Sequence, residues 1–306
     1  MKICITLHDF DNQGVKMLSP FAECIDIRAA GARPNEDELC ELVETYDILI
    51  IGIREIMTPR VYSHVKNLRI LGTLSIGIDH IDKVFFDDDR IKVFNCPDSN
   101  VPSVGEHTFA LALALYKKLF ESHVAVIQDV KLEARPRDLY QKTIGVVGAG
   151  KIGRRVIELG KAFGMNVLCY TFHPENHQDL LNHGVTFVSL DELFGNAQII
   201  SIHLPFTDQS SKLISSNLIN SMRPDAVLIN TSRMKIVDND ALYDALETNR
   251  IMGAAMDGDF DNSDLKRIET LSNIIVTPHT AGTTSDANMR IDTDLAKTLV
   301  KELTRF

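Results

Sequence analysis

The sequence lacks any long apolar run, and it has few cysteines. No segment approaches about 18 continuous apolar residues, so no membrane-spanning helix is expected. The first residues, MKICITLHDF, are too polar for the apolar region of a secretory signal. The five cysteines form no Cys-x-x-Cys pair, and their number is odd. We therefore expect free thiols, mostly in the core, in a reducing and cytoplasmic compartment.

Positively charged residues are also fewer than negatively charged ones. The chain has 32 Lys and Arg against 42 Asp and Glu, which gives a formal net charge of -10. Nucleic acids bind proteins through clustered Lys and Arg, so a nucleic-acid partner is not expected. No metal site is predicted. The length of 306 residues accommodates about two domains of roughly 100–200 residues each.

Ten short apolar runs resemble β-strands, and many of them carry Ile and Val on both faces. Such strands are typical of parallel sheets that helices cover on both sides. Amphipathic patterns typical of helices lie between them, for example at Glu36–Thr45, 151–163 and 239–249. The alternation predicts doubly wound α/β sheets. The ten runs are residues 2–7, 47–52, 68–73, Thr143–Val147, Asn166–Tyr170, 186–188, 198–203, 226–230, 251–256 and 273–277.

Two longer helical patterns suggest that the chain passes twice between two domains. Residues 103–121 are apolar almost all round, which predicts one buried helix, and residues 285–305 form the second pattern. The predicted substrate-binding domain is discontinuous, 1–98 plus 285–306, and the predicted dinucleotide-binding domain, 99–284, is inserted into it. The polar stretch 128–140 is expected to be a loop or arm.

A glycine motif follows the strand-like run Thr143–Val147 and opens a helical pattern. It reads Gly148-x-Gly150-x-x-Gly153. The first glycine allows a tight turn, the second lets a pyrophosphate approach the backbone, and the third lets the helix pack closely on the strand. The helix N-terminus then offers N–H groups to the phosphates. This context favours dinucleotide binding over a purely structural glycine turn.

The choice between NAD and NADP stays open. An Asp or Glu at the end of the second strand would bind the adenosine ribose, but Thr171 follows Tyr170 at this place. Without that carboxylate nothing repels the 2′-phosphate of NADP. Yet no Arg occurs at positions 171–177, where His173 and His177 are the only cationic candidates.

Three further motifs, together with the glycine loop and the turn at residues 75–79, carry a family resemblance. They are VFNCPDSNVPSVGEH at 93–107, LINTSRMKIVD at 228–238 and IVTPHTAG at 275–282. In this order and spacing the sequence resembles the D-2-hydroxyacid dehydrogenases, which include phosphoglycerate dehydrogenase-like proteins. The resemblance implies two doubly wound parallel-sheet domains, Rossmann-like and flavodoxin-like. It also implies a homodimer and hydride transfer between a nicotinamide cofactor and a small D-2-hydroxy or 2-keto acid.

The resemblance also assigns site residues. His279 would be the general acid and base, and Arg233 would hold the substrate carboxylate or the developing oxyanion. On the substrate side, it implies Arg54, the main-chain N–H groups of Ile76 and Gly77, and Asn100. The implied cofactor-binding residues are Val104, Gly148, Gly150, Lys151, Ile152, Gly153, Tyr170, Thr171, His203, Pro205, Thr207, Thr231, Ser232 and Asp257.

One position departs from the family pattern. The family has a Glu that pairs with the catalytic His, and counting forward from Asp257 places Asn262 there. A carboxylate beside a His favours the protonated ring, whereas Asn can only orient it. One hypothesis is that Asn262 weakens keto-acid reduction near neutral pH; the other is that Asp259 or Asp261 restores the pair. The departure also keeps open a nucleotide-binding sensor without turnover, or a dehydrogenase of a formate- or phosphite-like donor.

Overall fold

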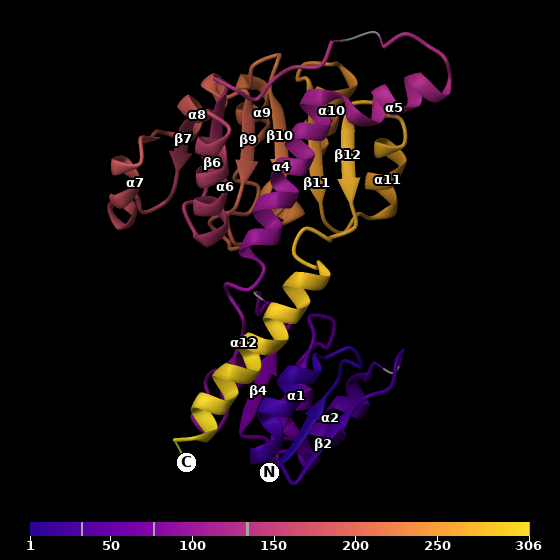
Figure 1. Cartoon of the computed structure of the whole chain (residues 1–306), viewed down its shortest axis with the longest axis vertical. Coiled ribbons are helices and arrows are strands. Elements are labelled where there is room, and N and C mark those ends of the chain that lie inside the picture. Colours follow the sequence, from indigo (N-terminus) through magenta and orange to yellow (C-terminus); the bar gives the residue numbers. More distant parts are fainter. Residues whose placement is uncertain (32, 76, 133–134, 306) are drawn as a thin grey trace. The chain divides into compact units, whose positions relative to one another are not determined.

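The computed structural model describes residues 1–31, 33–75, 77–132 and 135–305, and the chain divides into two compact units (Figure 1). Unit 1 comprises Met1–Asn100 and Thr284–Phe306, and unit 2 comprises Val101–Thr283. The predicted boundaries, after residues 98 and 284, lie two residues and one residue away from these.

Unit 1 is built on a five-stranded parallel sheet in the order β2-β1-β3-β4-β5. This is the flavodoxin-like order of a doubly wound fold. The strands are β1 (Lys2–Ile5), β2 (Cys24–Ile27), β3 (Ile48–Ile51), β4 (Ile70–Thr73) and β5 (Lys92–Phe94). The helices are α1 (Asn12–Leu18), α2 (Glu36–Thr45), α3 (Pro59–Ser63) and α12 (Ser285–Leu303), with short 3-10 turns at η1 (Ser19–Phe21) and η2 (Lys83–Phe85).

Alternate residues of these strands enter two separate cores, one on each face of the sheet. Ile48 and Ile50 of β3 pack with α1 and α12, whereas Leu49 and Ile51 pack with α2 and α3. Because both faces are buried, β3 has no polar residue, as its sequence indicated. Leu295 of α12 is fully buried against this sheet, so the C-terminal helix is part of unit 1.

Unit 2 is built on a seven-stranded parallel sheet in the order β12-β11-β10-β9-β6-β7-β8. Strand order reverses beside β6, as in the Rossmann arrangement, so the predicted fold class is confirmed. The strands are β6 (Thr143–Val147), β7 (Asn166–Tyr170), β8 (Val185–Phe187), β9 (Ile199–Ile202), β10 (Val227–Asn230), β11 (Gly253–Asp257) and β12 (Ile274–Thr277). The helices are α4 (Val101–Lys117), α5 (Leu119–Ile127), α6 (Lys151–Ala162), α7 (Asp179–Asn182), α8 (Leu190–Asn196), α9 (Ser216–Ser221), α10 (Asn239–Glu247) and α11 (Asn262–Ile268), with 3-10 turns η3 (Pro174–His177) and η4 (Met234–Ile236).

Helices cover both faces of this sheet. Side chains of α4 and α6 bury one face with Val146, and side chains of α8, α9 and α10 bury the other with Val147. Both faces of the sheet are therefore covered by helices. Polar groups are found in the loops at the amino and carboxyl ends of the strands.

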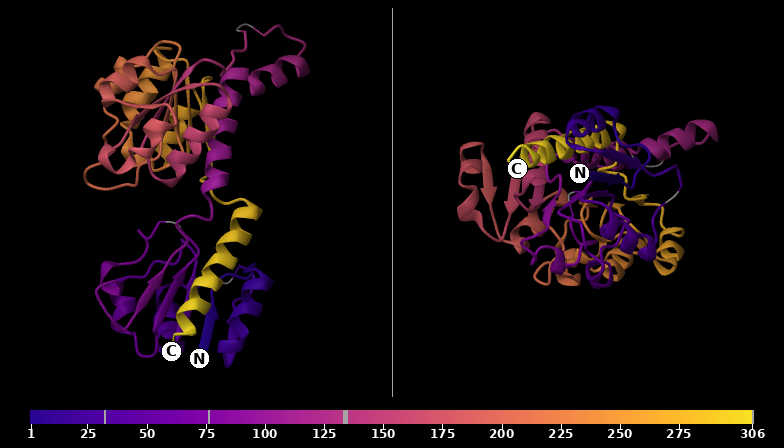
Figure 2. Two further views of the ribbon diagram at one scale, coloured as in Figure 1. Left: turned by 60° about the vertical axis from the view of Figure 1, so that its left-hand side comes forward. Right: turned by 90° about the horizontal axis from the view of Figure 1, so that it is seen from below.

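The prediction of one buried helix over residues 103–121 is wrong. The chain forms α4 and then α5, with Lys118 between them in the left-handed conformation at φ 49°. Apolar composition predicted burial along the whole segment, but α5 leaves the layers of unit 2 and points away from them (Figure 2). Its side chains Phe120 and Val126 are 59% and 82% exposed.

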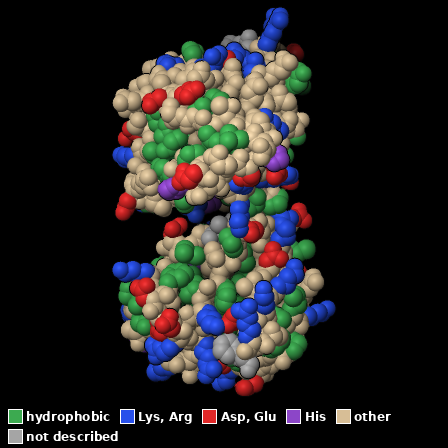
Figure 3. Space-filling model, turned by 90° about the vertical axis from the view of Figure 1, so that its left-hand side faces the viewer, with side chains coloured by type: hydrophobic (Ala, Val, Ile, Leu, Met, Phe, Trp, Pro, Cys, Tyr) green, Lys and Arg blue, Asp and Glu red, His purple; other side chains and the backbone are tan. Residues whose placement is uncertain are grey.

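All five cysteines are free thiols, and Cys4, Cys40, Cys96 and Cys169 are buried, as expected. Within the described part of the chain, no helix is long and apolar enough to cross a bilayer. The same residues contain no group of three or more His, Cys, Asp or Glu side chains placed to hold a metal ion. On the face that Figure 3 shows, acidic and basic side chains are interspersed on both units.

A buried acid in α12 makes the stability of unit 1 depend on pH. Asp292 accepts a hydrogen bond from the Asp11 N–H at 2.9 Å, and burial, with help from Asp9 and Asp11, raises its pKa from 3.8 to about 6. The unfolded chain loses this proton near its ordinary pKa while the folded chain keeps it. The free energy of unfolding therefore falls as the pH rises from about 4 to 6, by at most about 3 kcal/mol.

We expect Asp292→Asn to remove this loss, because a neutral amide oxygen can accept the same hydrogen bond without ionising. The variant should gain stability over the wild-type protein as the pH rises from 4 to 7, measured by urea unfolding. A difference between the two proteins that stays constant over this range would contradict the assignment.

Candidate functional site

The glycine motif forms a turn that tolerates no side chain at its first position. Gly148 has φ +108°, and its N–H donates to the Tyr170 carbonyl oxygen at 2.7 Å. A Cβ there would lie 2.5 Å from the carbonyl oxygen of His203. The turn therefore holds β6 close to the ends of β7 and β9, at the place where the strand order reverses.

The next two glycines form the N-terminus of α6. A Cβ on Gly153 would lie 1.9 Å from the Gly148 carbonyl oxygen, so helix and turn touch through backbone alone. A Cβ on Gly150 would meet nothing within 4 Å, and no side chain caps the helix. Lys151, Ile152 and Gly153 form the first turn of α6. Open space beside uncapped helical N–H groups fits the pyrophosphate of a dinucleotide.

The segment after β7 contains an arginine contact that the sequence did not reveal. Tyr170 and Thr171 are half-buried. Arg154 of α6 reaches the following segment, where it donates to Asp179 Oδ1 at 3.0 Å and lies 2.9 Å from His177 Nδ1. The predicted cationic candidates follow the strand, whereas Arg154 comes from α6, one helical turn beyond Gly150.

The segment after β9 is held by its own hydrogen bonds. His203 Nε2 lies 2.7 Å from Ser201 Oγ, and burial lowers the pKa of His203 to about 3, so the ring is neutral. The Thr207 N–H donates to Ser210 Oγ at 2.8 Å, and that hydroxyl donates to the Pro205 carbonyl oxygen at 2.7 Å. The His203 carbonyl group, and not its ring, lies against the glycine turn.

Asn230 shapes the turn that presents Arg233, and the sequence analysis did not single it out. Its buried amide donates to the Arg233 carbonyl oxygen at 3.1 Å and accepts from the Ser232 N–H at 3.0 Å. The Thr231 hydroxyl lies 3.2 Å from that of Thr108 on α4. The Arg233 side chain is half-buried directly after β10.

Asp257 ends β11 as a buried carboxylate that three donors satisfy. It accepts from the Thr277 hydroxyl at 2.6 Å, the Thr280 N–H at 2.7 Å and the Ala281 N–H at 2.9 Å. His107 Nε2 lies 3.1 Å from the same Thr277 hydroxyl. These bonds close the loop that carries His279 onto the edge of the sheet.

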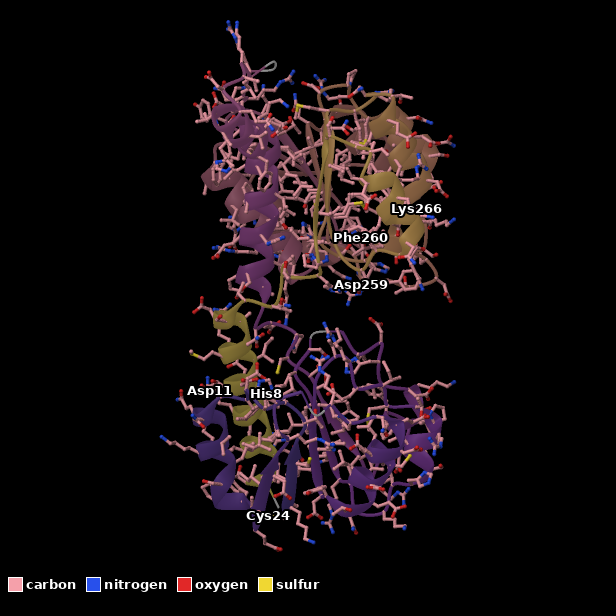
Figure 4. All side chains as sticks on the ribbon, turned by 90° about the vertical axis from the view of Figure 1, so that its right-hand side faces the viewer. His8, Asp11, Cys24, Asp259, Phe260 and Lys266 are labelled. Atoms are coloured by element: carbon pink, nitrogen blue, oxygen red, sulfur yellow. The ribbon has the colours of Figure 1, made fainter. Side chains whose placement is uncertain are left out.

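His279 lies in the closed loop with φ +54°, a conformation that few non-glycine residues adopt. Its Nδ1 atom is 3.2 Å from Asp259 Oδ2. Asn262, the residue at the position of the family Glu, is the first residue of α11. The carboxylate that meets the ring is thus Asp259, which lies at the carboxyl edge of the sheet (Figure 4).

Strand order brings the candidate catalytic residues to one edge of unit 2. β10, β11 and β12 are adjacent and parallel, with Asn230 paired to Met256 and Asp257 paired to Thr277. Arg233 and His279 follow the two outer strands of this triplet. Because carboxyl ends of parallel strands lie on the same side, both side chains start from the edge that carries the glycine turn.

The candidate substrate-side residues follow β3, β4 and β5 at the carboxyl edge of the unit 1 sheet. Arg54 is exposed, Gly77 is half-buried, and Asn100 Oδ1 is buried without a hydrogen-bond partner among the described residues. Ile76 lies outside the described residues. Val104 is buried on α4, in unit 2.

A buried hydrogen-bond chain shapes the turn that carries Gly77. His80 Nε2 lies 2.9 Å from Thr73 Oγ1, which lies 2.8 Å from Ser75 Oγ, and that hydroxyl donates to the Gly77 carbonyl oxygen at 2.7 Å. Burial lowers the pKa of His80, which disfavours the charged form of the ring in this hydrogen-bond chain. Neither Ser75 nor His80 was among the predicted site residues.

Comparison with known proteins agrees with this architecture. The sequence model of the family described as D-isomer specific 2-hydroxyacid dehydrogenase, NAD binding domain, matches residues 109–281. The chain is 33% identical to D-3-phosphoglycerate dehydrogenase from Synechocystis sp. over 94% of its length, but it spans only 51% of that protein. It is 30% identical to hydroxypyruvate reductase from Thermotoga maritima, covering 88% of this chain and 89% of that protein.

Solved structures give the same result. An acyclic imino acid reductase in complex with NADPH and D-Arg matches with a TM-score of 0.89 at 28% identity, over 100% of this chain and 98% of the other. D-lactate dehydrogenase from Aquifex aeolicus, complexed with NAD and lactic acid, matches with 0.84 at 30% identity, over 100% and 96%. The chain belongs to the D-isomer specific 2-hydroxyacid dehydrogenase family. Most of unit 2 matches the NAD-binding domain of that family.

The open space at Gly150 gives a direct test of the nucleotide site. We expect Gly150→Ala to keep the fold, because its Cβ meets no protein atom within 4 Å, and to weaken NADH binding about tenfold or more by filling the approach to the helix N-terminus. Binding is measured by fluorescence titration. Gly195→Ala, which also places its Cβ in open space, is the matched control and should bind like the wild-type protein. Equal binding by all three proteins would place the pyrophosphate elsewhere.

Proposed function

We propose that this protein transfers a hydride between NAD(P) and a small D-2-hydroxy acid or its 2-keto acid. The observation that carries the proposal is the common edge of unit 2, where the glycine turn, Arg233 and the His279–Asp259 pair all follow parallel strands. Family membership supports the reaction class. The chain spans about half the length of the D-3-phosphoglycerate dehydrogenases from Synechocystis sp. and Methanocaldococcus jannaschii that it matches.

The chemistry divides between two side chains. When bound, the nicotinamide supplies or accepts the hydride at the substrate carbon. His279 Nδ1 faces Asp259, which leaves Nε2 to hold the proton that the carbonyl oxygen takes up during reduction. Arg233, as a planar donor of paired N–H groups, binds the carboxylate and opposes the charge that develops on the oxygen. In the oxidation direction His279 accepts the hydroxyl proton.

The candidate substrate-side residues at the carboxyl edge of the unit 1 sheet are assigned by the family resemblance. We assign the main chain at Gly77 and the side chain of Arg54 to the substrate carboxylate or its substituent, and Asn100 to a polar contact. The orphaned Oδ1 of Asn100 and the rigid chain from His80 to Gly77 support this assignment. We assign Val104, Tyr170, Thr207, Ser232 and Asp257 to the surroundings of the cofactor, where Asp257 acts through the loop that it closes.

Both nucleotides are expected to bind. Thr171 carries no charge that would repel a 2′-phosphate, and Arg154 is already held by Asp179 and gives that phosphate no strong attraction. The solved relatives include one with NADPH and one with NAD.

Initial rates of NADH and NADPH oxidation with glyoxylate, pyruvate, hydroxypyruvate and a phosphorylated keto acid test the reaction class. We expect turnover with at least one acid, and His279→Gln should lower kcat by about 10²–10⁴-fold through loss of general acid catalysis. Nucleotide affinity should not change in this variant, which controls for folding.

The same assay separates the alternatives. Nucleotide binding without turnover of any acid would favour a nucleotide sensor. Turnover of keto acids only in the presence of an amine would favour imine reduction, as in the imino acid reductase that matches over the whole chain.

We also propose that the protein is a cytoplasmic homodimer. Free thiols that are mostly buried support a reducing compartment. The second copy would cover the apolar side chains of α5 and of the residues after it. Exposure of such a group of apolar side chains to water is unfavourable. These are Leu119, Phe120, Val124, Val126, Ile127 and Val130, each at least 45% exposed.

Phe120→Glu should convert the dimer to a monomer in sedimentation velocity, because the carboxylate would be buried without a partner. Phe86→Glu, which changes another exposed Phe in unit 1, should leave the dimer intact. A wild-type monomer at micromolar concentration would refute the proposal.

A further inference from the structure

We infer that Asp259 is the carboxylate that positions and charges His279, in place of the family Glu. The inference rests on the proposed function and deepens it. The Nδ1–Oδ2 distance of 3.2 Å is within hydrogen-bond range, and both residues belong to unit 2. Asp259 is a positioning residue, since it acts through the ring and not on the substrate.

Strand register places these two residues together. Asp257 is the partner of Thr277 in the pairing of β11 with β12. The pairing continues one step further, because the Gly258 N–H donates to the Thr277 carbonyl oxygen at 3.0 Å. Asp259 and His279 each lie two residues beyond the paired positions. The register therefore brings the two loops that carry them to neighbouring places at the carboxyl edge of the sheet, and the contact itself is the Nδ1–Oδ2 approach.

Gly258 follows β11 at a place where the segment after β10 packs closely on the chain. A Cβ at this position would lie 3.0 Å from Met234 Cγ, in η4. A side chain at position 258 would press on η4, and glycine avoids this contact next to Asp259.

Neither of the other two candidates is placed to do this. Asp261 is the N-cap of α11, and its Oδ1 accepts from the N–H groups of Ser263 at 2.7 Å and Asp264 at 2.9 Å. Hydrogen bonds from Ser263 and Asp264 lower the pKa of Asp261, as expected for an acid that caps a helix. Asn262 is already within the first turn of that helix.

Other charged residues lie on the segments around the His279 loop. Below the loop, Asp257 is occupied by Thr277, Thr280 and Ala281. On α4, His107 is held by Thr277. The segment after β10 brings Arg233 and Lys235 on either side of Met234, and both are cationic. Asp259 is therefore the acid in contact with the imidazole among the described residues.

The pair is more exposed than a buried catalytic dyad. The Asp259 side chain is 95% exposed and that of His279 is 36% exposed. Solvent and salt screen such a pair, so the help that Asp259 gives to the protonated ring should depend on ionic strength. This property distinguishes it from a carboxylate enclosed in the protein.

Asp259→Asn tests the inference with Asp261→Asn as a matched control. In low salt, Asp259→Asn should shift the alkaline limb of the kcat profile for keto-acid reduction to lower pH by up to about half a unit, roughly a threefold loss of rate on that limb. High salt should shift the wild-type limb in the same direction and leave the variant almost unchanged. Asp261→Asn keeps a capping oxygen and should behave like the wild-type protein.

A conservative variant tests whether the carboxylate itself is responsible. Asp259→Glu should recover most of the lost rate. An unchanged limb in Asp259→Asn, or an equal shift in Asp261→Asn, overturns the inference.

The pair can also be tested without turnover. Proton NMR follows the ring of His279, identified by the resonance that disappears in His279→Gln. Asp259→Asn should lower the pH at which this ring loses its proton, whichever substrate the protein uses. A missing shift refutes the pair, whereas a clear shift in a protein that reduces no acid refutes only the proposed function.

Discussion

A buried carboxylate holds together the edge on which the candidate site is built. Asp257 is 2% exposed, and an ionised group in that environment is tolerated only when donors surround it. Here a hydroxyl from β12 and two N–H groups from the following loop provide them. The same bonds that satisfy Asp257 fold the loop back on the sheet and keep His279 in a left-handed conformation. Asp257 therefore acts on the site through the loop that it holds.

The two sheets are built in the same way. In each, apolar residues on both faces bury the strands, and polar residues gather where parallel strands end. Unit 2 adds the glycine turn at the reversal of strand order, where backbone groups can approach a phosphate without interference from side chains. Unit 1 gives its turn after β4 a hydrogen-bond chain that ends on a carbonyl group.

Every fully buried strand is predictable from the sequence, because runs of Ile and Val are a strong signal. The strands β2 and β5 are not, since they are only partly buried and carry charged residues, so their apolar signal is weak. The break at Lys118 is also not predictable, since nothing in the composition of that helix marks a left-handed residue. For the partner of His279, counting along the chain gives Asn262 at the family position and leaves Asp259 and Asp261 as alternative acids, and the structure shows Asp259 in contact with the ring. Linear spacing describes a loop of standard length, and this loop is short.

Burial protects four of the five thiols from oxidants. Burial raises the pKa of Cys4 to about 11 and those of Cys96 and Cys169 to about 12, so almost none of each is thiolate at neutral pH. Peroxide and alkylating agents react with the thiolate, and they also need access that the core denies. Cys24 is the partly exposed one, and Figure 4 shows it at the end of unit 1 opposite to His8 and Asp11. Oxidative damage to cysteine is thereby directed to a strand end remote from the carboxyl edge of its own sheet.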